Sequence, residues 1–210
     1  MHSDTAIIIF AREPVAGQVK TRLIPALGAE GACHLYQQLL EHTLNTGIQS
    51  ALADIQLCIT PESDTAYFNR LSQAKHFQLS IQTGDDLGQR MFNAMASALK
   101  HYKKVLLIGT DCPFLSADDL QQAIAALDNY NMVFSPAYDG GYVLVGAKNI
   151  IVEIFSAIDW GTERVMQQTR SCLNNTDLSW YELAKQYDID VPEDLRHIEQ
   201  LFQFKKKYSG

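Results

Sequence analysis

The chain has 210 residues and a hydrophobic content of 47%, which suits one globular domain with a complete core. Its formal net charge of −7, from 17 basic and 24 acidic side chains, argues against a general nucleic-acid binder, because such proteins carry a basic surface. The four cysteines form no Cys-x-x-Cys pair, and no apolar run reaches the length of about 20 residues that a membrane span needs. We therefore expect a cytoplasmic protein with reduced thiols.

Strand-like and helix-like patterns alternate along the whole sequence. In chain order we expect a strand at 6–10, a helix at 31–49, a strand at 54–60, a short helix at 66–72, a strand at 79–83, a helix at 87–101, a strand at 105–109, a helix at 116–127, strands at 132–137 and 142–147, and helices at 150–155, 162–174 and 194–208. This alternation predicts one domain, 1–210, built as a three-layer α/β/α sandwich around a mainly parallel sheet. Asp139-Gly140-Gly141 predicts a hairpin or a sharp re-entry, with antiparallel pairing around 135–147.

Two of the expected strands end in polar segments of opposite charge. The strand at 6–10 leads into a loop with three basic side chains and a glycine: Arg12, Gly17, Lys20 and Arg22. The strand at 105–109 ends on Asp111. In open α/β sheets such groups converge at the carboxyl ends of the strands. Cations that meet phosphate oxygens, and a carboxylate that holds a bridging hard cation, are what a nucleotide site with a divalent metal needs.

The basic loop matches neither common glycine motif for phosphate. It lacks Gly-Lys-Ser/Thr at Walker spacing and also lacks Gly-x-Gly-x-x-Gly. Gly17 would let backbone N–H groups approach a phosphate, Lys20 would supply a point charge, and Arg22 would supply a forked set of donors. A solvated basic turn is the alternative that these residues leave open.

The segment that begins at Asp111 also has two interpretations. A carboxylate after an apolar strand is costly to bury unless it is paired or bound to a metal. It could equally cap or turn the chain before Pro113 and the next helix, where Ser116 and Asp119 resemble a capping box. Cys112 has no neighbouring histidine to activate it, so we interpret it as a buried thiol and not as a nucleophile.

Two further acidic segments attract attention. Asp188 and Asp190 are two residues apart before the expected closing helix, and in an extended segment they share a face and could hold one cation. The helix macrodipole favours Glu193 and Asp194 at the start of that helix, but it explains Asp188 and Asp190 less well. Asp139 precedes two glycines whose amides are open to a ligand, and it could accept hydrogen bonds from sugar hydroxyls. An ordinary tight turn is the simpler account of that segment.

Weaker candidates lie at two other places. Gly88 and Arg90 open the helix expected at 87–101, where they could reach a base or a phosphate, although a capped helix start is simpler. Trp160 and Thr162 could close over a ligand, although a single tryptophan is more often part of a core.

Six motifs in order span nearly the whole chain: the basic loop, Gly-Asp-Asp-Leu-Gly, Thr-Asp-Cys-Pro, Asp-Gly-Gly-Tyr, Trp-Gly-Thr and Asp-Ile-Asp-Val-Pro-Glu-Asp-Leu. This order resembles the glycosyltransferase-A, or nucleotide-diphospho-sugar transferase, superfamily, whose α/β/α sandwich is the fold that we expect. It closely resembles an uncharacterised bacterial family labelled selenodomain-associated transferase or glycosyltransferase. More distantly, it resembles the phospholactate and molybdopterin guanylyltransferases.

The resemblance implies roles for the strand-end residues, which we combine with the candidates above. The expected nucleotide-binding residues are Arg12, Gly17, Lys20, Arg22, Gly88 and Arg90. The expected substrate-binding residues are Asp139, Gly140, Gly141, Trp160 and Thr162. The resemblance implies Mg²⁺ or Mn²⁺ at Asp111 and Asp190, with Asp188 as a neighbouring ligand, and we take Lys20 and Asp111 as catalytic. Two departures stand out: Asp-Cys-Pro replaces the usual Asp-x-Asp, and Val191 replaces a common threonine.

Our main interpretation is a metal-dependent transferase with a nucleotide-sugar donor and a small-molecule acceptor. The sequence does not determine the oligomeric state, and a homodimer is one possibility. One alternative is a nucleotidyltransferase that joins a nucleoside triphosphate to a phosphorylated acceptor. The basic loop slightly favours this alternative, because a triphosphate carries more charge, whereas the family label favours glycosyl transfer. A second alternative is a non-catalytic nucleotide-binding subunit, because the Asp-x-Asp motif is incomplete.

Overall fold

The computed structural model describes residues 3–61, 65–156, 158–198 and 201–202. The strands are β1 (Thr5–Ala11), β2 (Asp54–Ile59), β3 (Gln78–Ile81), β4 (Lys104–Ile108), β5 (Met132–Pro136), β6 (Tyr142–Ala147) and β7 (Trp180–Glu182). The α-helices are α1 (Ile24–Ser50), α2 (Thr65–Ala74), α3 (Leu87–Ala98), α4 (Ala117–Asn129) and α5 (Val165–Asn174). Short 3₁₀ helices are η1 (Thr21–Leu23), η2 (Val152–Ile154) and η3 (Pro192–His197).

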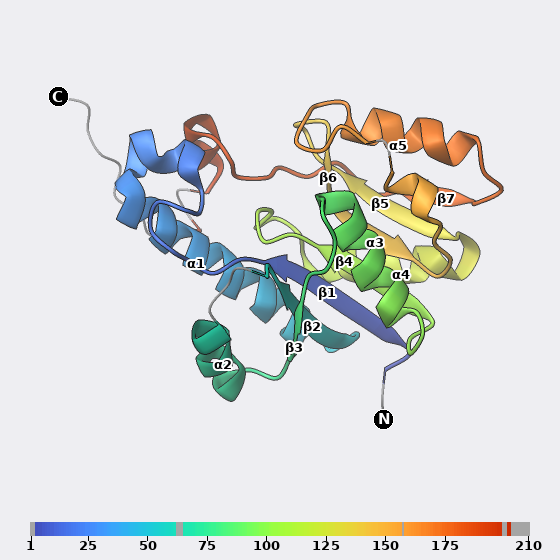
Figure 1. Cartoon of the computed structure of the whole chain (residues 1–210), viewed down its shortest axis with the longest axis horizontal. Coiled ribbons are helices and arrows are strands. Elements are labelled where there is room, and N and C mark those ends of the chain that lie inside the picture. Colours follow the sequence, from blue (N-terminus) through green and yellow to red (C-terminus); the bar gives the residue numbers. More distant parts are fainter. Residues whose placement is uncertain (1–2, 62–64, 157, 199–200, 203–210) are drawn as a thin grey trace.

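The strands form one sheet in the order β3-β2-β1-β4-β6-β5-β7. Strand β6 runs antiparallel to β4 and β5, and the other neighbouring pairs are parallel. The expected hairpin is therefore confirmed as β5–β6. The chain leaves β1 towards β2 and β3 on one side, and β4 begins the other side, so the strand order reverses between β1 and β4 (Figure 1). In α/β sheets, ligands bind beyond the carboxyl ends of the strands at such a point.

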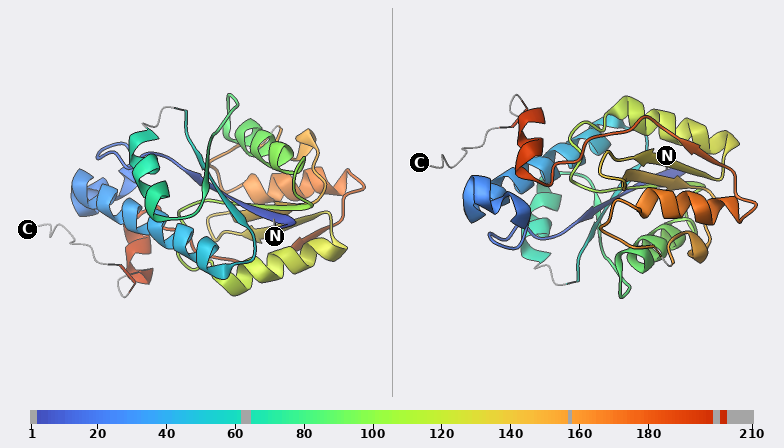
Figure 2. Two further views of the ribbon diagram at one scale, coloured as in Figure 1. Left: turned by 90° about the horizontal axis from the view of Figure 1, so that it is seen from below. Right: turned by 90° about the horizontal axis from the view of Figure 1, so that it is seen from above.

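Helices cover both faces of the sheet, as the alternating pattern predicts (Figure 2). On one face, α1, α2 and α4 pack against alternate strand residues such as Ile7 and Ile9. On the other face, α3 and α5 pack against the intervening residues such as Ala6 and Ile8. Because both faces are buried, the strands are continuous apolar runs. The three-layer sandwich with a mainly parallel sheet is confirmed.

The end of the described chain returns to the start of α1. Ile189, Leu195 and Ile198 are buried against Leu23 and Leu27, at the end of the sheet to which β1 points (Figures 1 and 2). This contact has no counterpart in local sequence patterns. It places the acidic segment before η3 beside the basic loop after β1.

Several element boundaries differ from those expected. Helix α1 begins earlier than residue 31, with a break at Gly28, whose φ is 74°. The expected helix at 150–155 is a single 3₁₀ turn, and α5 begins three residues later than expected, at Val165. Strand β7 was not expected, because three residues are too few to display alternation. Of the closing helix expected at 194–208, residues 194–197 belong to the 3₁₀ helix η3, and residues 198 and 201–202 are turn and bend; residues 199–200 and 203–210 lie outside the described residues.

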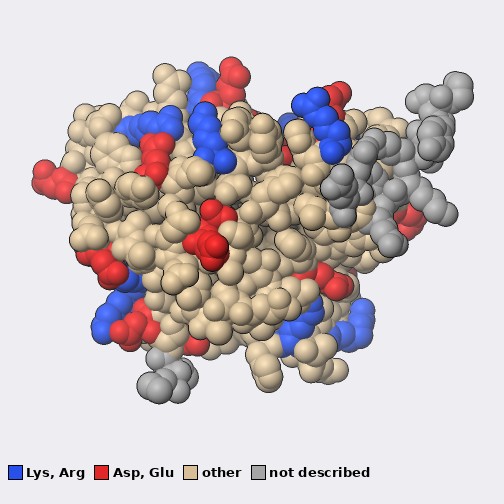
Figure 3. Space-filling model, turned by 180° about the vertical axis from the view of Figure 1, so that it is seen from behind, with Lys and Arg blue, Asp and Glu red and all other residues tan. Residues whose placement is uncertain are grey.

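Acidic and basic side chains are interspersed on the face seen in Figure 3. None of the helices in the described residues is both long enough and apolar enough to cross a membrane.

Candidate functional site

The loops that follow β1 and β4 meet where the strand order reverses. The two strands are parallel neighbours, with Ile9 paired to Ile108, so their carboxyl ends lie side by side. The backbone N–H of Ile189 donates to the carbonyl of Asp111 at 2.9 Å, which attaches the returning chain to the end of β4. Three segments that are far apart in sequence therefore form one site.

Lys20 is the centre of this site. Its ammonium lies 2.8 Å from Asp111 Oδ1 and 3.8 Å from Asp190 Oδ1, and it donates to the Ile189 carbonyl at 2.5 Å. The Lys20 side chain is only 4% exposed, whereas that of Asp111 is 49% exposed. The ammonium is therefore a buried internal cation, and its two carboxylate partners face the solvent.

The backbone of Lys20 is unusual as well. Its φ of 47° is in the left-handed region, which a residue with a side chain occupies at a cost of about 1–2 kcal/mol. Strained backbone of this kind gathers at ligand-binding sites, where the surrounding contacts hold it in place.

Arg22 completes the cluster from the solvent side. Its guanidinium donates to Asp190 Oδ2 at 2.7 Å, and its side chain is 67% exposed. The backbone N–H groups of Asp190 and Val191 both donate to the Asp194 carboxylate, at 2.9 and 2.8 Å. This cap at the start of η3 fixes the orientation of the Asp190 segment.

Asp188 has different charged neighbours. Burial, and after it the Asp139 and Asp111 carboxylates, raise the pKa of Asp188 to about 6, while a backbone hydrogen bond and Lys20 act in the opposite direction. Ile189, between the two acids, is fully buried, so Asp188 and Asp190 flank it on the open side. The structure thus brings Asp188 close to both Asp111 and Asp139, while Asp190 pairs with Arg22.

The Asp139-Gly140-Gly141 turn is held from two sides. The Gly141 N–H donates to Asp139 Oδ1 at 2.8 Å, which is the local turn that its sequence favours. The Met166 N–H donates to the Gly140 carbonyl at 2.8 Å, and a Cβ on Gly140 would lie 2.6 Å from the carbonyl carbon of Glu163. The turn is therefore locked against the start of α5.

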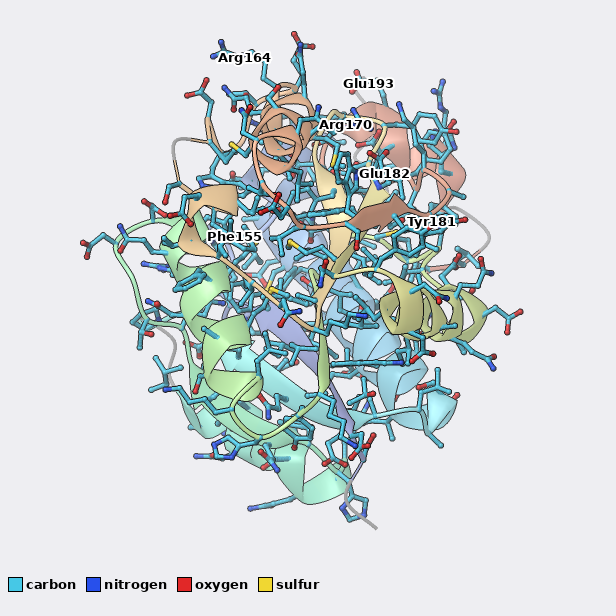
Figure 4. The ribbon with its side chains drawn as sticks, turned by 90° about the vertical axis from the view of Figure 1, so that its right-hand side faces the viewer. Phe155, Arg164, Arg170, Tyr181, Glu182 and Glu193 are labelled. Carbon is cyan, nitrogen blue, oxygen red and sulfur yellow. The ribbon has the colours of Figure 1, made fainter. Side chains whose placement is uncertain are left out.

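Gly88 and Trp160 are packed together, which favours the structural interpretation of both. A Cβ on Gly88 would lie 2.6 Å from Trp160 Nε1 and nearer still to the carbonyl oxygen of Phe155, which Figure 4 places beside α3. Trp160 also makes an edge contact with Tyr142, with ring centroids 6.2 Å apart. Gly88 is thus a close-packing residue at the start of α3.

Arg90 and Thr162 likewise make local contacts. Arg90 Nε donates to the Gly84 carbonyl at 3.0 Å, and Asp86 caps α3 by accepting from Gln89 N–H at 2.8 Å. Thr162 donates to the Asp159 carbonyl at 2.8 Å. These bonds fit a capped helix start and an ordinary turn, and they leave the direct ligand roles of Arg90 and Thr162 as proposals.

Two residues that the sequence did not single out support the strand ends. The Tyr36 hydroxyl accepts from Arg12 N–H at 3.0 Å and donates to the Arg12 carbonyl at 3.1 Å, and burial raises the Tyr36 pKa to about 12. Buried Gln82 donates to the carbonyls of Ala11 and Cys58. Tyr36 lies within a regular helical pattern, so no local signal marks it.

Cys112 is buried, and burial raises the pKa of its thiol to about 12. The thiol is therefore protonated at neutral pH, which agrees with our interpretation that it is not a nucleophile.

The acidic cluster fits a divalent cation that also binds phosphate. Among the described residues, no group of three or more His, Cys, Asp and Glu side chains could hold a metal ion. Asp111 and Asp190, however, already approach one positive charge, the Lys20 ammonium. Mg²⁺ commonly takes only one or two carboxylates and completes its coordination with water and substrate phosphate. The residues present therefore suit a metal shared with a nucleotide.

Comparison with solved structures identifies the fold. A protein from Desulfovibrio desulfuricans G20, described as a "putative nucleotide-diphospho-sugar transferase", has a TM-score of 0.85 and 30% identity, over 95% of this chain and 89% of its own. The 4-diphosphocytidyl-2C-methyl-D-erythritol synthase from Anaerococcus prevotii has a TM-score of 0.63 and 15% identity, over 93% and 94%. Rv0371C from Mycobacterium tuberculosis, solved with manganese, has a TM-score of 0.56 and 15% identity, over 94% and 98%.

The fold is that of the nucleotide-diphospho-sugar transferases, and the resemblance noted in the sequence is confirmed. The chain belongs to the family described as "Uncharacterized protein conserved in bacteria (DUF2064)", whose model matches residues 43–162. No curated protein matches the chain.

Proposed function

We propose that this protein is a metal-dependent transferase that uses a nucleotide-sugar donor and a small-molecule acceptor. The observation that carries the proposal is the Lys20 ammonium between Asp111 and Asp190 at the carboxyl ends of β1 and β4. It combines a cation for phosphate oxygens with carboxylates for a divalent ion, at the position where α/β sheets bind nucleotides. The description of the relative from Desulfovibrio desulfuricans supports the choice of donor.

In this proposal the acidic residues would bind the metal ion and the basic residues would bind the phosphates. Asp111 and Asp190 would hold Mg²⁺ or Mn²⁺, which when bound neutralises the charge on the departing phosphate. Lys20 and Arg22 would turn to phosphate oxygens and stabilise the same charge. Arg12 and Gly17 would extend the contact along the loop. An acceptor hydroxyl would replace the nucleoside diphosphate at the sugar carbon.

The acceptor side would be formed by the Asp139 turn and Asp188. Asp139 and Asp111 both help to raise the pKa of Asp188, so the three carboxylates are close enough to interact electrostatically. Carboxylates of this kind accept hydrogen bonds from sugar or acceptor hydroxyls. We therefore assign Asp190 to the metal and Asp188 to a neighbouring substrate contact.

Nucleotidyl transfer is the second candidate, and one observation favours it. Lys20 and Arg22, from the same loop, both lie beside the acidic pair, so two cations are at hand for the oxygens of a triphosphate. Here a phosphorylated acceptor would attack the α-phosphorus of a nucleoside triphosphate and release pyrophosphate. The proposed roles of the loop and of the acids stay the same.

A thermal-shift panel of nucleotides and nucleotide sugars, with and without Mn²⁺, tests the proposal. A Mn²⁺-dependent shift with a nucleotide sugar, followed by turnover, supports glycosyl transfer. A shift with triphosphates alone supports nucleotidyl transfer. Binding without turnover would mean a non-catalytic binding subunit. The absence of any nucleotide-dependent shift would contradict the proposal.

Single substitutions test which residues bind the metal ion and the nucleotide. Asp111→Asn should remove the Mn²⁺-dependent part of nucleotide binding, because the site loses a hard anionic ligand. Asp4→Asn is the matched control, since Asp4 also pairs with a lysine, Lys103, at 2.6 Å, but at the opposite end of β1. Lys20→Ala should weaken triphosphate binding by about 10–150-fold, from a charge-assisted bond of about 1.5–3 kcal/mol, and should affect a monophosphate less.

A further inference from the structure

The basic loop, residues 12–22, is attached to helix α1 by one buried side chain. Strand β1 ends at Ala11, so Arg12 is the first residue of the loop. The Tyr36 hydroxyl accepts from the Arg12 N–H at 3.0 Å and donates to the Arg12 carbonyl at 3.1 Å. One phenol therefore satisfies both backbone groups of the residue at which the chain leaves the sheet.

The same side chain packs against the loop near its lysine. Val19, which directly precedes Lys20, is only 2% exposed and forms a small apolar cluster with Cys33 and Tyr36. Ala16 packs against this cluster from the middle of the loop. Cys33 and Tyr36 are three residues apart on α1, so they share a face of the helix. The loop is therefore held by hydrogen bonds at its exit from β1 and by apolar packing beside its lysine.

The Tyr36 hydroxyl also lies near the end of β4. Burial raises the pKa of Tyr36 to about 12; Arg12 and the Thr110 side chain lower it, whereas the Asp111 carboxylate raises it. Thr110 is itself buried, and its hydroxyl lies 3.5 Å from Asp111 Oδ1. One phenol from α1 therefore interacts both with the loop after β1 and with the residues that follow β4.

We propose that Tyr36 is a positioning residue, which holds the basic loop in its phosphate-binding arrangement before a nucleotide arrives. This role rests on the proposed function and adds to it a residue on α1 that acts through others. The Tyr36 side chain is buried, and its hydroxyl is bonded to backbone, so it acts on the nucleotide only through Arg12 and through Val19 beside Lys20.

The loop needs such support because part of its backbone is strained. Lys20 has a φ of 47°, in the left-handed region that disfavours a residue with a side chain. Conformations of this kind persist where the surrounding contacts hold them. When only a fraction of the molecules has the binding-competent conformation, the apparent affinity falls by that fraction. Contacts that fix the loop in advance therefore strengthen nucleotide binding without touching the nucleotide.

Amide hydrogen exchange of the whole chain without ligand tests the hold on the loop. Tyr36→Phe removes the two hydrogen bonds to Arg12 and keeps the ring that packs against Val19. Two such bonds together change an equilibrium constant by about 5–150-fold. Protected amides exchange in proportion to the open fraction, so residues 12–20 should exchange faster in the variant by about this factor.

Tyr102→Phe is the matched control. The Tyr102 hydroxyl also donates a hydrogen bond, to Asp54 Oδ2 at 3.0 Å, but Asp54 is at the start of β2 and so at the opposite end of the sheet from the loop. This variant should leave the exchange of residues 12–20 unchanged.

Ligand binding supplies the second readout. Calorimetric titration with inorganic pyrophosphate in the presence of Mn²⁺ should give a Kd for Tyr36→Phe that is about 5–150-fold higher than that of the wild type. With the nucleotide that turns over in the panel, KM should rise by the same factor while kcat stays near that of the wild type, because the bound nucleotide itself holds the loop. Lys20→Ala, which removes a phosphate contact, should lower kcat as well.

Three results would overturn the inference: equal exchange of residues 12–20 in Tyr36→Phe and the wild type, equal pyrophosphate affinities, or the same losses in Tyr102→Phe. If Tyr36→Phe does not fold, Val19→Ala takes its place, because it keeps both hydrogen bonds and loosens the packing beside Lys20. It should change both readouts in the same direction. Failure of the nucleotide panel would refute the proposed function, whereas the exchange rates would still decide whether Tyr36 holds the loop.

Discussion

Replacing Gly140 by alanine tests how the turn that carries Asp139 is held. Gly140 has a φ of 94°, in the left-handed region that favours glycine. A Cβ there would lie 2.6 Å from the carbonyl carbon of Glu163, a backbone atom that cannot rotate away. Two costs therefore combine: backbone strain and a collision with the start of α5.

The size of each cost can be estimated. Left-handed backbone costs a residue with a side chain about 1–2 kcal/mol, and overpacking against fixed atoms costs about 1–3 kcal/mol. Gly140→Ala should therefore lower the free energy of unfolding by about 2–5 kcal/mol. Gly161 is the matched control, because its φ is 80° but a Cβ would meet nothing within 4 Å. Gly161→Ala should cost only the strain, about 1–2 kcal/mol.

Urea unfolding and thermal melting of the two variants measure the difference. At about 2–4 °C per kcal/mol for a chain of this length, an extra cost of about 1–3 kcal/mol lowers the Tm of Gly140→Ala by about 2–12 °C relative to Gly161→Ala. Equal unfolding free energies in the two variants would refute the idea that the turn is locked against Glu163.

Three further changes have defined outcomes. Cys112→Ser should keep metal-dependent nucleotide binding, and the wild type should resist alkylation at neutral pH, since burial raises the thiol pKa to about 12; substrate-derived labelling of Cys112 would contradict this. Arg170 on α5 and Glu182 on β7 form a bidentate pair with bonds of 2.7 and 2.8 Å (Figure 4), and the hydrogen bonds from Arg170 hold the Glu182 pKa below its ordinary value. Glu182→Gln should therefore lose about 1 kcal/mol of stability at pH 7, and the difference from the wild type should disappear as the pH falls through the folded-state pKa; a difference that stays constant in acid would exclude the ion pair as its cause. Tyr142→Phe should preserve or raise stability by up to about 1–3 kcal/mol, because the buried hydroxyl has no hydrogen-bond partner among the described residues, and a clear loss in urea unfolding would reveal a partner.

Much of the fold follows from local signals. Continuous apolar runs mark strands buried on both faces, and most of the expected strands and helices are present. The capping box of Ser116 and Asp119 is present because its hydrogen bonds lie within one turn. The hairpin at Asp139 follows in the same way from turn chemistry. The sequence did not predict strand β7, because three residues are too few to show an alternating pattern and the strand is defined by its pairing with β5.

The candidate site likewise has features that local sequence identifies and features that depend on tertiary packing. The sequence by itself identified the basic loop and the acidic segments, because strand ends and charged loops have visible patterns. It did not determine that Lys20 is buried between Asp111 and Asp190, or that Asp188 is close enough to Asp139 to interact with it electrostatically. Those pairings join residues up to 170 positions apart and depend on the strand order and on the packing of Ile189 against α1. Only the tertiary structure decides them, because the distance between two charges is set by how the elements pack, and local sequence carries no record of that distance.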